Sequence, residues 1–308
     1  MPALPSRQVS RNRANPPLIV AKYQLKSIYK MKTITLPDGL NSENPQPIQL
    51  FDYRSSQEIS RQQIILNQNT ISFLADGTKE VLFDNTALSI DNTEFLIMKS
   101  GHCLMTEKLS EIREYRSVLL FFSSEMLLDF IQKHKFNTAH SSEQKSVFAF
   151  KYDAFIKSFV KSLVDVSKLS AATKNRLIQL KFEEILLYLT EIHGTGFLHA
   201  LSANSSDTAQ KFIRIIESNT LNKLTLRELA FLCNMSISTF KREFEKHYSE
   251  SPIKWFQNKR LEHANYLLNQ ERKSPSAIYF EVGYENLSSF IQAYKAKYGI
   301  TPKQQQNN

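Results

Sequence analysis

The side chains best suited to chemistry in this sequence lie near residue 240, where basic and hydroxyl groups alternate with aromatic ones. Phe240 and Phe244 stand four residues apart, which places both on one face of a helix. Ser238, Lys241 and Arg242 then lie on the outward face. Lysine and arginine donate hydrogen bonds to guanine in the major groove of DNA, and serine bonds to bases or phosphates. The spacing therefore predicts a helix that reads DNA.

A short helix and a tight turn precede this stretch, as a helix-turn-helix motif requires. Thr225 stands three residues before Glu228, which is the spacing of a capping box at the start of a helix. Asn234 and Met235 form the expected turn, and Ser236 is the expected N-cap of the following helix. Four residues of the first helix share its inward face: Leu226, Leu229, Ala230 and Cys233.

The same plan recurs later in the chain. Gly283 supplies the turn, Asn286 is the expected N-cap, and Phe290 and Tyr294 face inward. A helix from about Pro252 to Asn269 lies between the two motifs and is expected to hold them in a fixed relation. Two motifs about one DNA turn apart meet successive major grooves on one face of the duplex. The outward residues of the second motif are Leu287, Ser288, Ser289 and Gln292.

Positive charge gathers at both ends of the chain. The 308 residues include 39 Lys plus Arg and 30 Asp plus Glu, a formal net charge of +9. Residues 1–30 hold six basic residues and no acidic one, and residues 207–308 hold 15 basic and 10 acidic ones. A basic end is typical of proteins that bind nucleic acid or an anionic surface, but an unpartnered basic surface is about as common. The residue spacing, and not the charge, carries the prediction of DNA.

Several other classes of protein are disfavoured. No run of about 18 apolar residues could span a bilayer, which predicts a soluble protein without a membrane partner. Cys103 and Cys233 lack a nearby cysteine or paired histidine, which disfavours disulfide and zinc frameworks and favours a reducing cytoplasmic location. His102 is the only histidine before His134, so no metal site is predicted, and no cofactor or catalytic residue either. His102 is interpreted as a turn residue and Cys103 as a buried strand residue, not as a pair of ligands. Motifs of P-loop proteins, zinc proteases and serine hydrolases are also missing from the sequence.

Composition and periodicity divide the chain into units. The first 48 residues carry seven of the ten prolines and little periodicity, which predicts a largely disordered basic tail. Met31 begins a stretch typical of a protein start, so the native chain could equally begin there. Strand-like runs between Asp, Asn and Gly turn formers follow, and helical periodicity comes after residue 122. The predicted units are a tail (1–48), a first domain (49–200), a linker (201–210) and an all-α domain (211–304).

The two helix pairs and the helix between them closely resemble the DNA-binding domain of the AraC/XylS family of bacterial transcription regulators. The resemblance covers Lys211 to about Gln304 and rests on the ordered motifs L-R-E-L-A, M-S-I-S-T-F-K-R-E-F, K-R-L-E-H-A-N-Y-L-L and V-G-Y-E-N-L-S-S-F. It implies base contacts from Ser238, Lys241 and Arg242 in the first motif and from Leu287, Ser288, Ser289 and Gln292 in the second. It implies phosphate contacts, which set the register on DNA, from Thr239, Lys246, Asn286 and Lys295.

Three positions depart from the family pattern. Ser249 stands where glycine is usual after the first reading helix, which predicts a less regular turn. Tyr279 replaces a small alanine and Pro275 replaces an apolar residue, so the docking of the second motif is expected to differ. Leu287 either contacts a thymine methyl group or packs on the protein itself.

The first domain resembles, more weakly, the N-terminal half of the same family, a cupin-like β-barrel followed by helices. Its segment from Lys168 to His193 is similar to the dimerisation region of the branch that includes ExsA-type activators, and packs either against a second subunit or only on its own sheet. The resemblance implies an α+β fold: an N-terminal cupin-like β-barrel with a helical dimerisation region, then an all-α domain with two helix-turn-helix motifs. It also implies an unknown small ligand or a regulatory protein as the partner of the first domain.

These features together predict a sequence-specific DNA-binding transcription regulator, an activator, and not an enzyme. Its expected partners are double-stranded promoter DNA, RNA polymerase and a second copy of the chain. The alternative is a cupin-type enzyme with an appended DNA-binding module, against which the missing histidine cluster stands. An adaptor controlled by a protein partner is compatible with the first interpretation and differs in what occupies the first domain.

Overall fold

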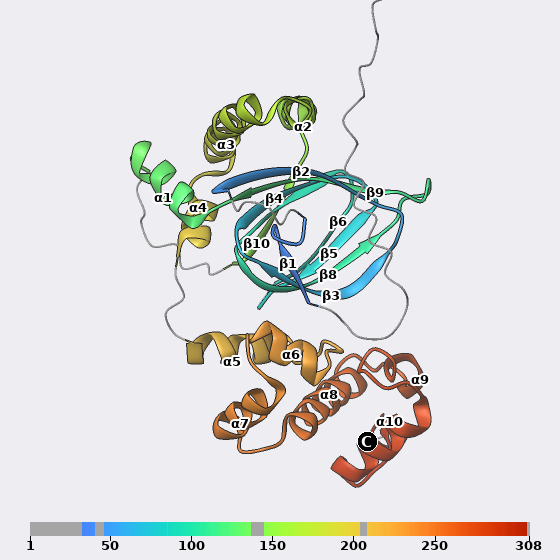
Figure 1. The fold of residues 1–308 in the computed structure, drawn as a ribbon. Coiled ribbons are helices and arrows are strands. Elements are labelled where there is room, and N and C mark those ends of the chain that lie inside the picture. Colours follow the sequence, from blue (N-terminus) through green and yellow to red (C-terminus); the bar gives the residue numbers. More distant parts are fainter. Residues whose placement is uncertain (1–32, 41–45, 85, 137–144, 204–207, 307–308) are drawn as a thin grey trace, which may run out of the picture.

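The computed structural model describes residues 33–40, 46–84, 86–136, 145–203 and 208–306, and Figure 1 shows their arrangement. Within these ranges, ten strands form two facing sheets, and helices cover the outer face of one of them. A helical domain lies beside the other sheet. No helix in these ranges is long and apolar enough to cross a membrane.

The first sheet contains β1 (Ile34–Leu36), β3 (Ile59–Leu66), β5 (Thr78–Leu82), β6 (Ala87–Ile90) and β8 (Gly101–Lys108). Its strand order is β1-β3-β8-β5-β6, with β1 parallel to β3 and the other pairs antiparallel. Lys79 on β5 lies directly opposite Glu107 on β8, and both side chains are buried. β1 also corrects the predicted tail, because Ile34–Leu36 pairs with β3 and so is not disordered.

The second sheet contains β2 (Ile48–Ser55), β4 (Asn69–Asp76), β7 (Glu94–Met98), β9 (Tyr115–Phe122) and β10 (Val147–Lys151). Its order is β10-β7-β4-β9-β2, and every pair is antiparallel. Gly77 turns the chain from β4 into β5 with a φ of +92°, and a Cβ there would lie 2.4 Å from the Lys108 carbonyl oxygen. Glycine is therefore required at this turn.

The space between the two sheets is filled mainly by apolar side chains. They come from alternate positions of both sheets, as the two-residue period of a strand requires. At one end of this interior, Lys79 Nζ lies 3.4 Å from Glu107 Oε1 and donates a 3.0 Å hydrogen bond to Ser72 Oγ. The predicted α+β class with a cupin-like first domain is confirmed, in the form of an open sandwich of two sheets. The buried apolar residues of the interior are Ile64, Leu66, Leu74, Val81, Phe83, Ile90, Leu96, Met98, Cys103, Met105, Tyr115, Leu119, Phe121 and Val147.

Four helices cover the outer face of the second sheet (Figure 1): α1 (Ser124–Lys133), α2 (Ala154–Ser167), α3 (Ala171–His193) and α4 (Gly196–Ser202). Ser123 and Asp153 cap α1 and α2 by accepting hydrogen bonds from backbone N–H groups. Strand β10, which the sequence analysis did not predict, separates α1 from α2. The alternation of Val147, Phe148, Ala149 and Phe150 is the local signal for this strand.

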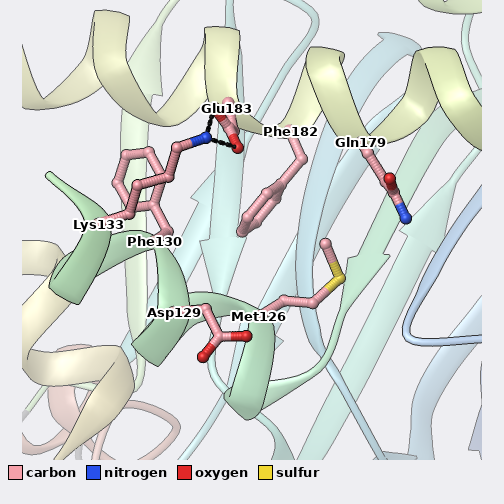
Figure 2. A pocket seen from close by; sticks show the side chains of 7 residues that line it. All are labelled: Met126, Asp129, Phe130, Lys133, Gln179, Phe182 and Glu183. Atoms are coloured by element: carbon pink, nitrogen blue, oxygen red, sulfur yellow. Dashed lines mark hydrogen bonds and ion pairs between the residues drawn. The ribbon is translucent and has the colours of Figure 1, made fainter.

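A shallow surface pocket lies between α1 and α3, and Figure 2 shows its lining. Phe130 and Phe182 form its apolar wall. Lys133 reaches across the pocket from α1 and donates hydrogen bonds of 2.6 and 2.8 Å to the two carboxylate oxygens of Glu183 on α3. This ion pair joins the two helices at the surface of the first domain.

The helical domain contains α5 (Thr208–Ser218), α6 (Leu226–Leu232), α7 (Ile237–Tyr248), α8 (Pro252–Asn269), α9 (Pro275–Ile278), α10 (Leu287–Tyr298) and α11 (Pro302–Gln306). Its buried apolar residues form two main clusters, one around Phe240 and Phe244 and one around Phe290 and Tyr294. α8 contributes Phe256 to the first cluster and Leu261 to the second. Of the predicted linker 201–210, residues 204–207 lie outside the described ranges.

The first domain contacts the helical domain through β8 and the start of the first helix pair. Arg61, at a bulge in β3, donates a 2.6 Å hydrogen bond to the Lys223 carbonyl oxygen. Asn219 donates a 3.2 Å hydrogen bond to the carbonyl oxygen of Asp84. An apolar cluster joins the same surfaces and includes Leu104, Ile215 and Leu232.

Candidate nucleic-acid interface

The first helix of the first pair begins at the predicted capping box. The Thr225 side chain accepts a 3.2 Å hydrogen bond from the Glu228 N–H, and Glu228 Oε2 accepts a 2.7 Å bond from the Thr225 N–H. Both bonds satisfy backbone donors that have no partner within a helix. Arg61 of the first domain lies 3.8 Å from the second carboxylate oxygen of the buried Glu228. The start of α6 is therefore held by its own sequence and by the first domain.

The turn and the N-cap of α7 also follow the sequence-based prediction. Asn234 adopts a φ of +54°, a left-handed conformation that asparagine tolerates better than most residues. Ser236 Oγ accepts a 3.1 Å hydrogen bond from the Thr239 N–H and lies 2.8 Å from Thr239 Oγ1. Phe240 and Phe244 are fully buried against α5 and α8. This packing determines which face of α7 remains outward.

Four predicted side chains of α7 reach the solvent, and Thr239 is half-buried. Ser238, Lys241 and Arg242 are exposed side by side near the start of the helix. Lys246, one turn further on, is exposed and forms a 2.9 Å ion pair with Glu243. The structure thus brings a hydroxyl group and two exposed cations together near the start of α7, which is the part of a recognition helix that enters the major groove.

Ser249 ends α7 in the left-handed conformation, with φ of 52° and ψ of 21°. Its N–H donates a 2.9 Å hydrogen bond to the Glu245 carbonyl oxygen, which is the geometry of a glycine C-cap. The predicted irregular turn is therefore wrong, because serine adopts the conformation that glycine usually supplies. A non-glycine residue in this conformation costs about 1 kcal/mol or more.

The outward face of the second pair carries mainly hydroxyl and amide groups. Asn286 caps α10, because its Oδ1 accepts a 2.8 Å hydrogen bond from the Ser289 N–H. Ser288, Ser289, Gln292 and Lys295 are exposed along the outward face. The remaining predicted residue, Leu287, is half-buried and packs against the second apolar cluster. Of the two alternatives for Leu287, packing on the protein is the one seen in the structure.

The departures in the second pair are accommodated near α9. Pro275 occupies the first turn of this four-residue helix, where a missing N–H costs nothing. Tyr279 is half-buried at its end and packs on the rim of the second apolar cluster. Tyr279 is therefore accommodated as a half-buried residue against the second cluster.

Hydrogen bonds tie α10 to α8. The Tyr294 hydroxyl donates a 2.6 Å hydrogen bond to Asn265 Oδ1, and burial raises the pKa of this tyrosine to about 12, so the donor keeps its proton. Lys297 Nζ donates to the Asn258 carbonyl oxygen at 2.8 Å and to Glu262 at 3.1 Å. Partial burial raises the pKa of the Glu262 carboxyl, but hydrogen bonds from two lysines outweigh it and hold this pKa below its usual value.

His102 and Cys103 contribute to packing. His102 lies within β8, not in a turn as first expected, and its ring centroid is 4.9 Å from that of Phe231 on α6. Burial, and secondarily the charge of Lys211, lower the pKa of His102. Cys103 is fully buried as predicted, and burial raises the pKa of its thiol to about 12. Over the described ranges, no three His, Cys, Asp or Glu residues group as metal ligands.

Arg260 is a residue of this domain that the sequence alone does not single out. Arg260 on α8 lies beneath Gly283 and reaches the Asn222 carbonyl oxygen with a 3.2 Å hydrogen bond. Its position depends on contacts among three segments that are distant in the sequence, so no local pattern identifies it.

Comparisons with known proteins match both parts of the chain. A model of the ExsA N-terminal regulatory domain matches residues 69–201, and a model of a helix-turn-helix domain matches residues 229–308. The thermoregulatory protein LcrF of Yersinia pestis is 34% identical over 129 residues, 42% of this chain and 48% of LcrF. The chain thus spans about half the length of this relative.

A second relative matches over a greater length at lower identity. The HTH-type transcriptional regulator ExsA of Pseudomonas aeruginosa is 24% identical over 262 residues, 83% of this chain and 88% of ExsA. Among solved structures, ToxT from Vibrio cholerae is 12% identical, with a TM-score of 0.38 over 84% of this chain and 97% of that chain. A TM-score of that size is too low to support an argument about function.

Proposed function

Because this chain belongs to the AraC/XylS family of bacterial transcription regulators, we propose that it is a sequence-specific DNA-binding activator of transcription. The observation that carries the proposal is the pair of capped helices α7 and α10. Each buries two aromatic residues and leaves its outward face polar, and α8 joins the two helix pairs. Outward faces of this kind suit the donor and acceptor pattern of the major groove.

The proposed base contacts come from both helices. In α7 they are made by Ser238, Lys241 and Arg242, which are exposed together. In α10 they are made by Ser288, Ser289 and Gln292, while the packing of Leu287 leaves it at most the edge of its side chain for a thymine methyl group. The proposed phosphate contacts are Thr239, Lys246, Asn286 and Lys295.

Gel shift of the full chain at two salt concentrations tests this function. Duplexes selected by the protein from a random library are compared with unselected duplexes, because phosphate contacts alone bind both and weaken steeply with salt. We expect retention of the selected duplex at the higher salt. No preference for any selected duplex at either salt would contradict the proposal.

Single substitutions on α7 separate base contacts from phosphate contacts. Replacement of a base-reading side chain such as Arg242→Ala should cost about 1 to 3 kcal/mol and relax the base preference at one position. Lys246→Ala, on the same helix, is the matched phosphate variant and should weaken selected and unselected DNA equally. Equal losses for Arg242→Ala on both kinds of DNA would reassign it to the phosphates.

We propose that the first domain forms a homodimer through α3. Leu180 is 64% exposed and Leu187 is 39% exposed, seven residues apart on the same face of this helix. Exposed leucines that share one face of a helix are typical of an interface between subunits. Leu180→Glu should shift sedimentation from dimer to monomer, whereas Ile112→Glu, at an exposed loop residue outside the helix, should leave the dimer intact. A dimer unaffected by Leu180→Glu would contradict this interface.

A protein partner fits the first domain better than a small ligand within the sandwich. Fourteen buried residues and the Lys79–Glu107 pair occupy the space between the sheets. The pocket between α1 and α3 is open to the surface, where another protein could reach it (Figure 2). RNA polymerase is proposed as a partner of the DNA-bound protein. The alternative of a cupin-type enzyme has no observation in its favour within the described part of the chain.

A further inference from the structure

The relation between the two helix pairs depends on more than the helix that joins them. Each pair has its own apolar cluster, and α8 contributes to the two clusters at different points along its length. Around a single shared helix, the rotation of each core relative to the other depends on the side chains that contact both. Side chains that cross from one pair to the other therefore determine how rigidly the two reading faces are spaced.

Arg260 crosses between the two pairs from the middle of α8. Its side chain passes beneath Gly283, the turn of the second pair, where a Cβ atom would lie 3.1 Å from Arg260 Cδ and 3.3 Å from Nε and Nη1. Its Nη2 donates a 3.2 Å hydrogen bond to the carbonyl oxygen of Asn222, in the loop before the first pair. One side chain thus contacts the turn of one motif and the entry loop of the other.

A second contact joins the loop before the first pair to the segment before Gly283. Lys223, the neighbour of Asn222, places its Nζ 3.6 Å from the ring centroid of Phe280, three residues before Gly283. The ring of Phe280 is 66% exposed, so this cation–π contact lies at the surface, where such contacts are weak. The less exposed part of the link is Arg260, a half-buried side chain whose Nε atom is buried.

We propose that Arg260 is a positioning residue that sets the spacing and relative rotation of the two DNA-reading helices. The inference rests on the proposed DNA-binding function and adds to it a determinant of the distance between the two half-sites. Gly283 belongs to the same contact, because a Cβ atom there would lie 3.1 to 3.3 Å from the arginine side chain and would crowd it. This positioning role requires a guanidinium group, because Arg260 contacts Gly283 and the Asn222 carbonyl oxygen at the same time.

The test compares Arg260→Met with the wild type on selected duplexes. Methionine keeps the apolar stem and removes Nε, which is buried without a hydrogen-bond partner within the described residues, so the fold should be retained. Lys254→Ala is the control, because it removes one positive charge from the same helix at a side chain that is 71% exposed. The DNA probes are the selected duplex and the same duplex with one base pair inserted between the two half-sites.

An inserted base pair moves one half-site by about 3.4 Å and rotates it by about a tenth of a turn. We expect it to lower wild-type affinity about 10- to 100-fold, because the displaced helix loses base contacts worth about 1 to 3 kcal/mol each. In Arg260→Met this penalty should shrink at least about threefold, while affinity for a single half-site stays unchanged. Lys254→Ala should keep the wild-type penalty.

A measurement without DNA separates this inference from the proposed function. Two exposed residues, Glu245 on α7 and Ala296 on α10, are replaced by cysteine and carry spin labels. The native Cys103 and Cys233 are replaced by alanine, so that the labels report only the distance between the reading helices. Arg260→Met should broaden the distance distribution. An unchanged distribution, or an unchanged insertion penalty in a protein that binds DNA, overturns the role of Arg260. Loss of specific DNA binding by the wild type would instead overturn the proposed function, and the distance distribution would still decide the positioning role.

Discussion

The buried ion pair of the first domain allows a sharp test of what stabilises the interior of the sandwich. Lys79 is 2% exposed and Glu107 is 4% exposed, and they face each other across β5 and β8. Lys79 also bonds to Ser72 Oγ, which lies 2.9 Å from Ser117 Oγ on the neighbouring strand. Removing one charge leaves the other buried without its partner.

The expected loss follows from that burial. Breaking a buried pair by removing one partner costs about 3 to 5 kcal/mol, because the remaining charge is desolvated and uncompensated. Replacing both residues by apolar ones of similar size is often neutral. We therefore expect Lys79→Met to cost about 3 to 5 kcal/mol, and Lys79→Met with Glu107→Leu to restore most of that loss. Because a domain is stable by only about 5 to 15 kcal/mol, the single variant should be marginal.

The same two strands supply a control pair. Lys108 on β8 and Glu80 on β5 form a 3.1 Å ion pair with side chains that are 56% and 46% exposed. An exposed pair is worth about 0 to 1 kcal/mol, so Lys108→Met should change stability by no more than that.

The assay is urea unfolding of the full chain, followed by near-ultraviolet circular dichroism of the aromatic residues. Tyr115, which lies beside Lys79, reports the interior of the sandwich. A loss below about 1 kcal/mol for Lys79→Met, equal to that of the exposed control, would refute the reasoning from burial. A double variant as unstable as the single one would refute the claim that the unpaired charge causes the loss.

Three further predictions concern caps, turns and acid stability. Thr225→Ala should lower the free energy of unfolding of the helical domain by about 1 kcal/mol, seen as a lower urea midpoint. An unchanged midpoint would show that the capping box does not stabilise the domain. Gly299→Ala should cost about 1 kcal/mol from its φ of +77° alone. Gly283→Ala should cost more, because its Cβ would also lie 3.1 to 3.3 Å from the side chain of the half-buried Arg260, and equal melting temperatures would contradict this difference. Burial raises the pKa of Asp52, but Arg116 outweighs it and holds this pKa below the ordinary 3.8, so the stabilisation is present above about pH 4 and is lost as pH falls. Melting temperature should therefore fall more steeply between about pH 5 and pH 3 in the wild type than in Asp52→Asn, and parallel curves would refute the assignment.

Local patterns in the sequence predicted the helix pairs almost completely. Thr225 with Glu228 and Asn286 with Ser289 form the expected caps, and Phe240 and Phe244 are buried as their spacing requires. These features depend on residues three or four apart, whose contacts form in any chain that becomes helical at that point. The family resemblance of the helical domain rests on the same local features.

Most of the errors lie where contacts are distant in the sequence. β1 was predicted as part of a disordered tail, yet it pairs with β3, and β10 was missed because its partner β7 precedes it by about fifty residues. His102 was predicted at a turn but faces Phe231 of the other domain. A strand exists only when its partner is present, so a five-residue run such as Val147–Lys151 cannot be distinguished by its own composition.

The sequence by itself determined that the chain carries two capped helix pairs with polar outward faces and a β-rich domain before them. Only the tertiary structure decided how these parts are held together. Arg260 contacts Gly283 in the turn of the second helix pair and Asn222 before the first pair, and Arg61 bonds to the Lys223 carbonyl oxygen from the first domain. The physical reason is that caps and helical faces follow from bonds within one turn, whereas these contacts form between surfaces that only the folded chain brings within 4 Å.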